Sequence, residues 1–202
     1  MTTISVVVPN ITGREDLLDR CRAAYKQHSD GVRVEWIVAK DQGGAGHAWN
    51  AGASQATGDY LHLTCDDMLP HAGWADVAIS AAEQGVYPAP RILKADGELQ
   101  NCGTLGSGMM LGEVVDGTPV NASELPFLSR DLWQPGMVVT GHYYSDDWMG
   151  VWARHQGLSV EVRRDYLFTH LEGRVGRERV AGRPAMEDRD RVMRAATDLY
   201  AV

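Results

Sequence analysis

The chain has 202 residues, and its 19 Lys and Arg against 27 Asp and Glu give a formal net charge of −8 at pH 7. This length fits one domain, since domains have roughly 100–200 residues, and a composition of 44% hydrophobic and 23% charged residues excludes wholesale disorder and fibrous repeats. The acidic balance disfavours duplex DNA as a partner, because DNA binding needs a basic surface that displaces counter-ions.

The cysteines and the N-terminus bear on the cellular compartment. Three cysteines are scattered without a CxxC pair, and an odd number cannot complete a disulfide framework. The first residues carry no basic segment ahead of a long apolar run, and no stretch approaches the ~20 apolar residues of a membrane span. These features predict a reduced, cytoplasmic protein without a membrane span.

The N-terminal segment predicts a strand, a helix and a second strand. Residues 4–9 form a short β-branched run that ends at proline, which is typical of a parallel strand buried on both faces. Thr12 and Glu15 have the spacing of a capping box, so we expect a helix to start there. Apolar residues alternate over 32–38 and predict a second strand, which ends at Lys40 and Asp41.

The next segment repeats this alternation. A glycine-rich turn leads into a small-residue helix over 45–56, and a strand follows over 60–64. A helix is predicted over 74–84 and a short strand over 86–89. This order predicts an α/β fold with a parallel, doubly wound sheet over residues 1–90, in which ligands bind beyond the carboxyl ends of the strands.

The second half is less regular. Glycine and turn signals fill the region from 96 to 117, and order returns at Ser145 with a helix that ends before Gly157. Short extended pieces are predicted over 158–162 and 166–170, and an amphipathic helix over 186–200.

Two pairs of adjacent carboxylates are candidates for chemistry. Asp66 and Asp67 follow the third strand, where hard oxygen ligands can hold Mg²⁺ or Mn²⁺ beside a diphosphate. An isolated pair of this kind more often caps a turn, and only its place at a strand end favours the metal. Asp146 and Asp147 open the helix after Ser145, where they either cap it or supply a general base.

The region around residue 170 carries a histidine and a basic segment. His170 ends a strand, where a histidine is more often a structural hydrogen-bonding residue than a ligand. The stretch from residue 163 to residue 183 contains six arginines and three acidic residues, which gives it a local charge of +3 in an acidic chain. Such a segment either closes over phosphates or forms a solvated surface.

A series of motifs in this order resembles the GT-A-fold glycosyltransferases, most closely the inverting enzymes of family 2. The matching segments cover most of residues 4–172: Ser5–Pro9, Gly44–Gly52, Ala56–Pro70, Pro90–Gly103, Pro126–Trp133 and Tyr144–Trp148, with Gly157 and His170 behind them. The resemblance implies a GT-A fold, which is Rossmann-like, with a mainly parallel central sheet flanked by helices and a less regular acceptor half. It implies one domain over 1–183, divided into a nucleotide-sugar half (1–90), an acceptor half (91–172) and a flexible basic lid (173–183). A C-terminal helix is expected over 184–202.

The resemblance also implies roles for individual residues. Metal ligands are expected at Asp66, Asp67 and His170, and the catalytic base at Asp147 with Asp146 beside it. Contacts to the donor are expected from Pro9, Asn10, Asp41, Asn50, Asp66, Arg174 and Arg177. His142, Tyr144 and Trp148 flank the base and are candidates for the acceptor pocket, although a tryptophan at helical spacing is more commonly part of the core.

Three positions depart from the family pattern. Cys65 stands where many relatives carry the first aspartate of the metal motif, so the metal assignment depends on Asp66 and Asp67. The segment between Asp41 and Gly44 lacks the helix usual in the family. Trp49 replaces a basic residue that often precedes the Asn50 position.

The expected function is metal-dependent transfer of one hexosyl or pentosyl group, with inversion, from a UDP- or GDP-type sugar donor to an acceptor hydroxyl. One alternative is a catalytically weak or inactive module of the same fold that binds a sugar nucleotide or glycan. Another is a nucleotidyltransferase, which normally has a glycine-rich basic loop after the first strand, whereas this chain has one arginine there. No GxGxxG follows the first strand, which disfavours a dinucleotide-binding dehydrogenase.

Overall fold

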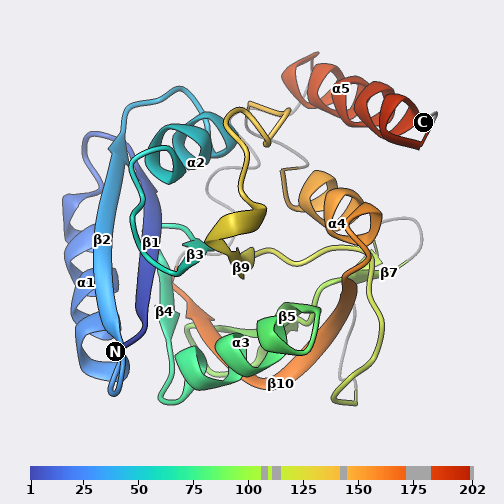
Figure 1. Cartoon of the computed structure of the whole chain (residues 1–202). Coiled ribbons are helices and arrows are strands. Elements are labelled where there is room, and N and C mark those ends of the chain that lie inside the picture. The colour runs from blue at the N-terminus through green and yellow to red at the C-terminus, as the bar shows by residue number, and fades with distance from the viewer. Residues whose placement is uncertain (106–108, 111–114, 142–144, 172–182, 201–202) are drawn as a thin grey trace.

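The computed structural model describes residues 1–105, 109–110, 115–141, 145–171 and 183–200 (Figure 1). Its first sheet has four strands in the order β2-β1-β3-β9. Strand β1 pairs in parallel with both β2 and β3, and β9 runs antiparallel to β3. The strands are β1 (Thr3–Asn10), β2 (Arg33–Lys40), β3 (Tyr60–Leu63) and β9 (Phe127–Ser129). The three strands predicted over the first 64 residues are thus confirmed within a residue or two of their ends.

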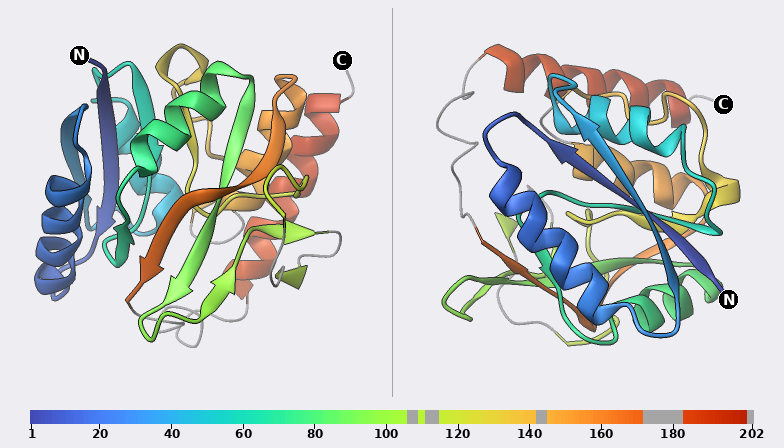
Figure 2. Two further views of the ribbon diagram at one scale, coloured as in Figure 1. Left: turned by 90° about the horizontal axis from the view of Figure 1, so that it is seen from below. Right: turned by 90° about the vertical axis from the view of Figure 1, so that its left-hand side faces the viewer.

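Strand β1 is covered on both faces, as its apolar run predicts. Its even-numbered residues, such as Val6, belong to one buried cluster with Tyr25 of α1 (Glu15–His28), and Val7 belongs to another with Trp49 of α2 (Ala45–Ala53). Figures 1 and 2 show α1 and α2 on opposite sides of β1 and β2. The first sheet therefore separates two cores.

A second four-stranded sheet has the order β4-β10-β5-β6. Its strands are β4 (Met68–Pro70), β5 (Val86–Lys94), β6 (Leu99–Asn101) and β10 (Ser159–His170). Strand β10 runs parallel to β5 and antiparallel to β4, and β6 is antiparallel to β5. The expectation that one doubly wound sheet spans residues 1–90 is wrong in one respect, because the strand that starts at Val86 belongs to this second sheet. A two-stranded piece is formed by β7 (Thr104–Leu105) and β8 (Met109–Met110).

Strand β10 unites two pieces that the sequence predicts as separate. Its register against β5 shifts between Val162 and Leu167, so the strand continues through an irregularity. Polar residues 163–165 lie at that irregularity and interrupt the apolar pattern. Helix α3 (Trp74–Glu83) packs on β10 and β5.

The remaining helices come from the second half of the chain. Helix α4 (Ser145–His155) follows its prediction, and a short 3-10 helix, η1 (Arg130–Leu132), follows β9. Helix α5 (Arg183–Tyr200) packs on α4 and buries Val192 in the core shared with α2 (Figure 1). Across the part of the chain that is described, no helix is both long and apolar enough to cross a membrane.

The predicted capping box at the start of α1 is wrong. Helix α1 begins at Glu15 with Arg14 as the residue before it, and no side chain caps its N-terminus. The backbone N–H and the hydroxyl of Thr12 instead donate to the carboxylate of Asp41, at 2.9 and 2.8 Å. Glu15 accepts from the N–H of Gly13 at 2.9 Å. A contact between residues far apart in the sequence thus replaces the local cap.

A buried histidine joins the two sheets. His62 of β3 has no solvent exposure, and its Nε2 lies 2.7 Å from the hydroxyl of Tyr25 in α1. Its Nδ1 lies 3.1 Å from the hydroxyl of Tyr166 in β10. The ring also packs against Trp74 and Phe168. Both ring nitrogens therefore have partners in an otherwise aromatic environment, and burial lowers the pKa of His62 to about 3.

This pKa makes stability depend on pH. His62 stays neutral in the folded chain but takes up a proton below about pH 6.5 when unfolded. The free energy of unfolding is therefore expected to fall by up to about 1.4 kcal/mol for each pH unit between pH 6.5 and 3, from this residue alone. Urea unfolding of the wild type and His62→Gln across this range measures the difference, and the exposed His47→Gln is the control. Parallel curves for the wild type and His62→Gln would contradict the prediction.

Candidate active site

The first acidic pair lies in the connection between the two sheets. Strand β3 ends at Leu63 in the first sheet and β4 begins at Met68 in the second, so Asp66 and Asp67 occupy the link. Both side chains are buried. The indole of Trp49 donates to the carbonyl of Thr64 at 3.0 Å, which fixes the start of the link to α2. The pair thus lies at the carboxyl end of β3, where the sequence places it.

Strand register brings two further residues to this pair. Val7 of β1 faces Leu63 of β3, so Asn10 and Asp66, each three residues further on, come together. The Asn10 amide donates to Asp66 Oδ2 at 2.9 Å. On the other side His170 of β10 pairs with Met68 of β4, which brings its Nε2 to 3.3 Å from Asp67 Oδ2.

Arg14 bridges the two carboxylates. Its Nη2 lies 2.9 Å from Asp66 Oδ1 and 2.9 Å from Asp67 Oδ2, and its Nε contacts both oxygens of Asp66 at 3.2 and 3.1 Å. Burial alone would raise the pKa of Asp67, but the hydrogen bond and charge of His170 and the charge of Arg14 lower it. Burial alone would lower the pKa of His170, and Asp67 raises it. At neutral pH the Asp67 carboxylate is therefore ionised.

The donor set of this cluster has the chemistry of a divalent-cation site. It offers carboxylate oxygens and an imidazole, and the Oδ1 atom of Asn10 is buried without a hydrogen-bond partner in the described structure. As they lie, no three His, Cys, Asp or Glu side chains among the described residues are placed to hold a metal ion. Burial and the two carboxylates raise the pKa of the Cys65 thiol, which keeps it protonated in the absence of a metal. The chemical types of these residues suit a hard cation, but the guanidinium of Arg14 lies between the two carboxylates.

Two other expected donor residues lie beside this cluster on the first sheet. Pro9 pairs with Ala39 and lies past the last partner of β3, so it belongs to the carboxyl end of β1, where its side chain is partly exposed. Asp41 follows β2 in a left-handed conformation, with φ of 54°, and its carboxylate accepts the two hydrogen bonds from Thr12. Those bonds, the backbone one first, lower the pKa of Asp41.

Asn50 has a structural partner. Its amide donates to the carbonyl of Val138 at 2.7 Å and its Oδ1 accepts from the N–H of Val138 at 3.1 Å. Nearby, the N–H of Gly46 donates to the carbonyl of Gly141, and a Cβ on Gly46 would collide with the carbonyl of Thr140. Helix α2 is therefore fastened along residues 138–141, and the expected role of Asn50 in donor binding stays a prediction.

The second acidic pair, Asp146 and Asp147, lies in the first turn of α4, which follows residues 138–141 along the chain. Ser145 and Thr140 hydroxyls lie 2.7 Å apart, and Asp188 of α5 accepts from the N–H of Gly141 at 3.1 Å. Burial, and then the charge of Asp146, raise the pKa of Asp147 to about 6. A carboxylate with this pKa is ionised at neutral pH and still basic enough to accept a proton.

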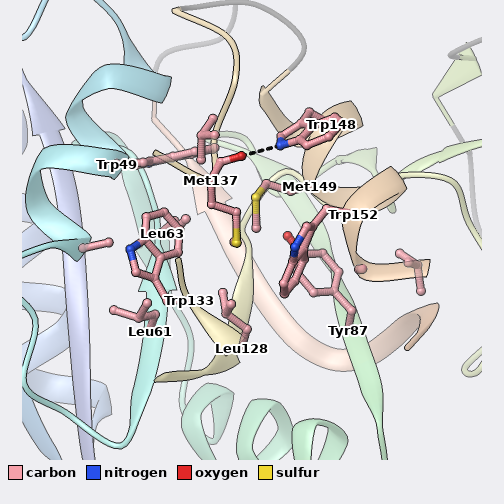
Figure 3. Packing of buried hydrophobic residues seen from close by; sticks show 14 of the residues in the cluster. Trp49, Leu61, Leu63, Tyr87, Leu128, Trp133, Met137, Trp148, Met149 and Trp152 are labelled. Carbon is pink, nitrogen blue, oxygen red and sulfur yellow. Dashed lines mark hydrogen bonds between the residues drawn. The ribbon is translucent and has the colours of Figure 1, made fainter. Parts of the chain in front are cut away.

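Trp148 lies in the core. It is 5% exposed, and its indole donates to the carbonyl of Met137 at 2.6 Å (Figure 3). It belongs to the same buried cluster as Trp49, so one packed core supports both acidic pairs. This position favours the core role over the acceptor pocket. His142, Tyr144, Arg174 and Arg177, and residues 173–182 of the expected lid, lie outside the described residues; residue 183 begins α5.

Sequence reasoning missed Arg14. A single arginine in a loop has no periodic signal, and its partners are more than 50 residues away. The one available signal is that Arg14 follows the end of β1 by four residues, and β1 is the neighbour of β3, the strand that precedes the acidic pair.

Comparisons with known proteins identify the fold. No protein-family model matches the chain, and no curated protein sequence matches it significantly. Among solved structures, it is similar to GalNAc-T7 with UDP, GalNAc and Mn²⁺, with a TM-score of 0.69 and 13% identity over 100% of this chain and 50% of that one. It is also similar to S. aureus TarS in complex with UDP-GlcNAc (TM-score 0.65, 12% identity, 98% of this chain and 66% of that one). A second TarS structure gives 0.61 and 11%, again over 98% of this chain and 65% of that one.

The chain thus spans half of the solved GalNAc-T7 chain and about two thirds of the solved TarS chain, which comprises residues 1–349 of that protein. The structural likeness confirms the predicted GT-A fold. At identities this low it establishes the fold alone. The more specific likeness to family 2 stays a prediction.

The pairing of Asn50 with Val138 gives a test of its role. Asn50→Ala leaves the N–H and carbonyl of buried Val138 without partners, so the free energy of unfolding is expected to fall by about 1–3 kcal/mol. Chemical unfolding measures this loss, and Gln55→Ala, exposed just after α2, is expected to stay within about 0.5 kcal/mol of the wild type. A variant as stable as the wild type would show that the pairing contributes nothing.

Proposed function

We propose that this protein is a glycosyltransferase that uses a nucleoside-diphosphate sugar of the UDP type and transfers one sugar to an acceptor hydroxyl with inversion. The observation that carries the proposal is the buried acidic pair at the carboxyl end of β3, in a fold whose solved neighbours hold UDP with Mn²⁺ and UDP-GlcNAc. Ligands of open parallel sheets bind beyond this end of the strands.

The donor site is assigned to the residues around the acidic pair. Asp66, Asp67 and His170 would hold a divalent cation such as Mn²⁺ or Mg²⁺, which neutralises the charge that develops on the departing diphosphate. Asn10 orients Asp66 through its amide, and the indole of Trp49 holds the carbonyl of Thr64, two residues before Asp66. Pro9 and Asp41, at the ends of β1 and β2, are assigned to the nucleoside.

The base is assigned to Asp147. Its pKa of about 6 lets it take the proton of an acceptor hydroxyl as that oxygen attacks the anomeric carbon. Attack from the face opposite the diphosphate inverts the configuration in one displacement. The neighbouring Trp148, anchored to Met137, fixes the helix turn that carries the base, and Asp146 keeps the pKa of Asp147 raised.

Binding of the donor nucleotide is tested by thermal unfolding. Nucleoside diphosphates are added with and without Mn²⁺, and a ligand at one hundred times its Kd adds about 2.7 kcal/mol to the free energy of unfolding. We expect UDP with Mn²⁺ to raise the melting temperature and AMP to leave it unchanged. If no nucleoside diphosphate raises it, with or without metal, the proposed donor is wrong.

The assignment of the base is tested with Asp147→Asn. This variant keeps the shape of the side chain but cannot accept the proton, so transfer, or donor hydrolysis when the acceptor is unknown, is expected to fall by about 10²–10⁴. Binding of UDP should be unchanged. In the wild type, kcat/KM is expected to decline below about pH 6, where Asp147 becomes protonated.

Asp76→Asn is the matched control, because Asp76 is an exposed carboxylate in the first turn of α3. It should leave turnover unchanged. Full turnover by Asp147→Asn would remove this residue from the mechanism.

A further inference from the structure

We propose that Arg14 competes with a divalent cation for the oxygens of Asp66 and Asp67, and so acts as a built-in counter-ion that the metal must displace. The inference concerns the same site as the proposed function and rests on it for the site's role. It assigns a regulatory contact to a residue that the sequence does not single out.

The contacts leave little room for both cations. Asp66 Oδ1 accepts from Nε and Nη2 of Arg14, and Asp66 Oδ2 accepts from Nε and from the Asn10 amide. Asp67 Oδ2 accepts from Nη2 and lies 3.3 Å from His170 Nε2. A Mg²⁺ ion requires oxygens at about 2.0–2.1 Å. An ion at that distance from the bridged oxygens would compete with the guanidinium and the amide for the same lone pairs, and the two positive charges would repel each other.

The guanidinium also explains how two adjacent carboxylates remain buried together. Their side chains are 8% and 11% exposed, and like charges this close need positive partners. Arg14 supplies one full positive charge against the two carboxylates, and His170 lies 3.3 Å from Asp67 on the other side. Much of the repulsion within the pair is thereby offset before any metal arrives.

Arg14 is the member of the cluster that can leave. Its side chain is 23% exposed, about two to three times as much as the carboxylates. It is held by the loop between β1 and α1, whereas Asp66 and Asp67 belong to the link between two sheets. Displacement of the guanidinium toward solvent therefore requires no rearrangement of either core.

Competition has a measurable consequence. When two cations exclude each other from the same oxygens, the observed affinity for one includes the cost of displacing the other. Removing the guanidinium should therefore tighten binding of the metal, even though it removes a contact from the fold.

The experiment measures Mn²⁺ binding without nucleotide, by calorimetry and by electron paramagnetic resonance of the unbound ion. Arg14→Gln is expected to lower the Kd for Mn²⁺ by at least about tenfold, the factor that 1.4 kcal/mol represents. Arg14→Lys keeps the charge but loses the bidentate fork, so an intermediate Kd is expected. Arg22→Gln, an exposed arginine on α1, is the matched control and should match the wild type.

A double variant locates the effect. In Arg14→Gln/Asp66→Asn the gain in affinity should disappear, because the shared oxygens are altered. A Kd for Mn²⁺ that is equal in the wild type, Arg14→Gln and Arg14→Lys would overturn the proposal, as would a gain that survives Asp66→Asn. If Arg14→Gln does not fold in EDTA, the Kd of Arg14→Lys against the wild type decides.

Nucleotide binding separates this inference from the proposed function. Tighter Mn²⁺ binding by Arg14→Gln, with no nucleotide bound by any variant, supports competition and contradicts the donor assignment. The opposite result has two parts. The wild type binds UDP without metal, and Arg14→Gln loses this binding while its affinity for Mn²⁺ stays that of the wild type. This result would overturn competition, support a nucleotide site, and identify Arg14 as a cation that itself serves the diphosphate.

Discussion

Two neighbouring carboxylates buried at the junction of two sheets impose the main constraint on this molecule. A buried charge without a partner is costly, so positive and hydrogen-bonding groups must be brought to Asp66 and Asp67. They come from two segments far apart in the sequence: Asn10 and Arg14 from the end of β1 and the loop after it, and His170 from the end of β10. The parallel register of β1 with β3 and the antiparallel register of β4 with β10 satisfy this requirement.

The same two strands, β3 and β10, also carry the structural histidine and its partner. His62 lies four residues before Asp66, and Tyr166 lies four residues before His170, so the aromatic junction and the charged junction are neighbours along both strands. Burial among aromatic rings lowers the pKa of His62, whereas the Asp67 carboxylate raises that of His170. Two histidines in one fold thus take opposite protonation preferences from their surroundings. One is kept neutral inside the fold, and the other is shifted toward its protonated form beside the acidic pair.

The sequence predicts those parts of the fold that depend on local pattern. The β-branched run of β1, the small residues of α2 and the acidic pair after β3 all lie where the sequence places them. The failures concern contacts between distant residues. Thr12 bonds to Asp41 instead of capping α1, and the polar residues 163–165 hide the continuity of β10. The pairing of Asn50 with Val138, 88 residues away, is a contact of the same kind, which no local pattern indicates. Arg14 was missed for the same reason, since only the folded register brings it to the acidic pair.

The hydrogen bonds between α2 and residues 138–141 connect the part of the chain near the first acidic pair to the part that leads into the second. At one end Trp49 holds the carbonyl of Thr64, and at the other Trp148 holds that of Met137. The closest point is Gly46 against Thr140, where even a methyl group has no space. A larger residue there would force α2 away from the chain segment that leads into α4. The fit of α2 against that segment therefore depends on a position that carries no side chain at all.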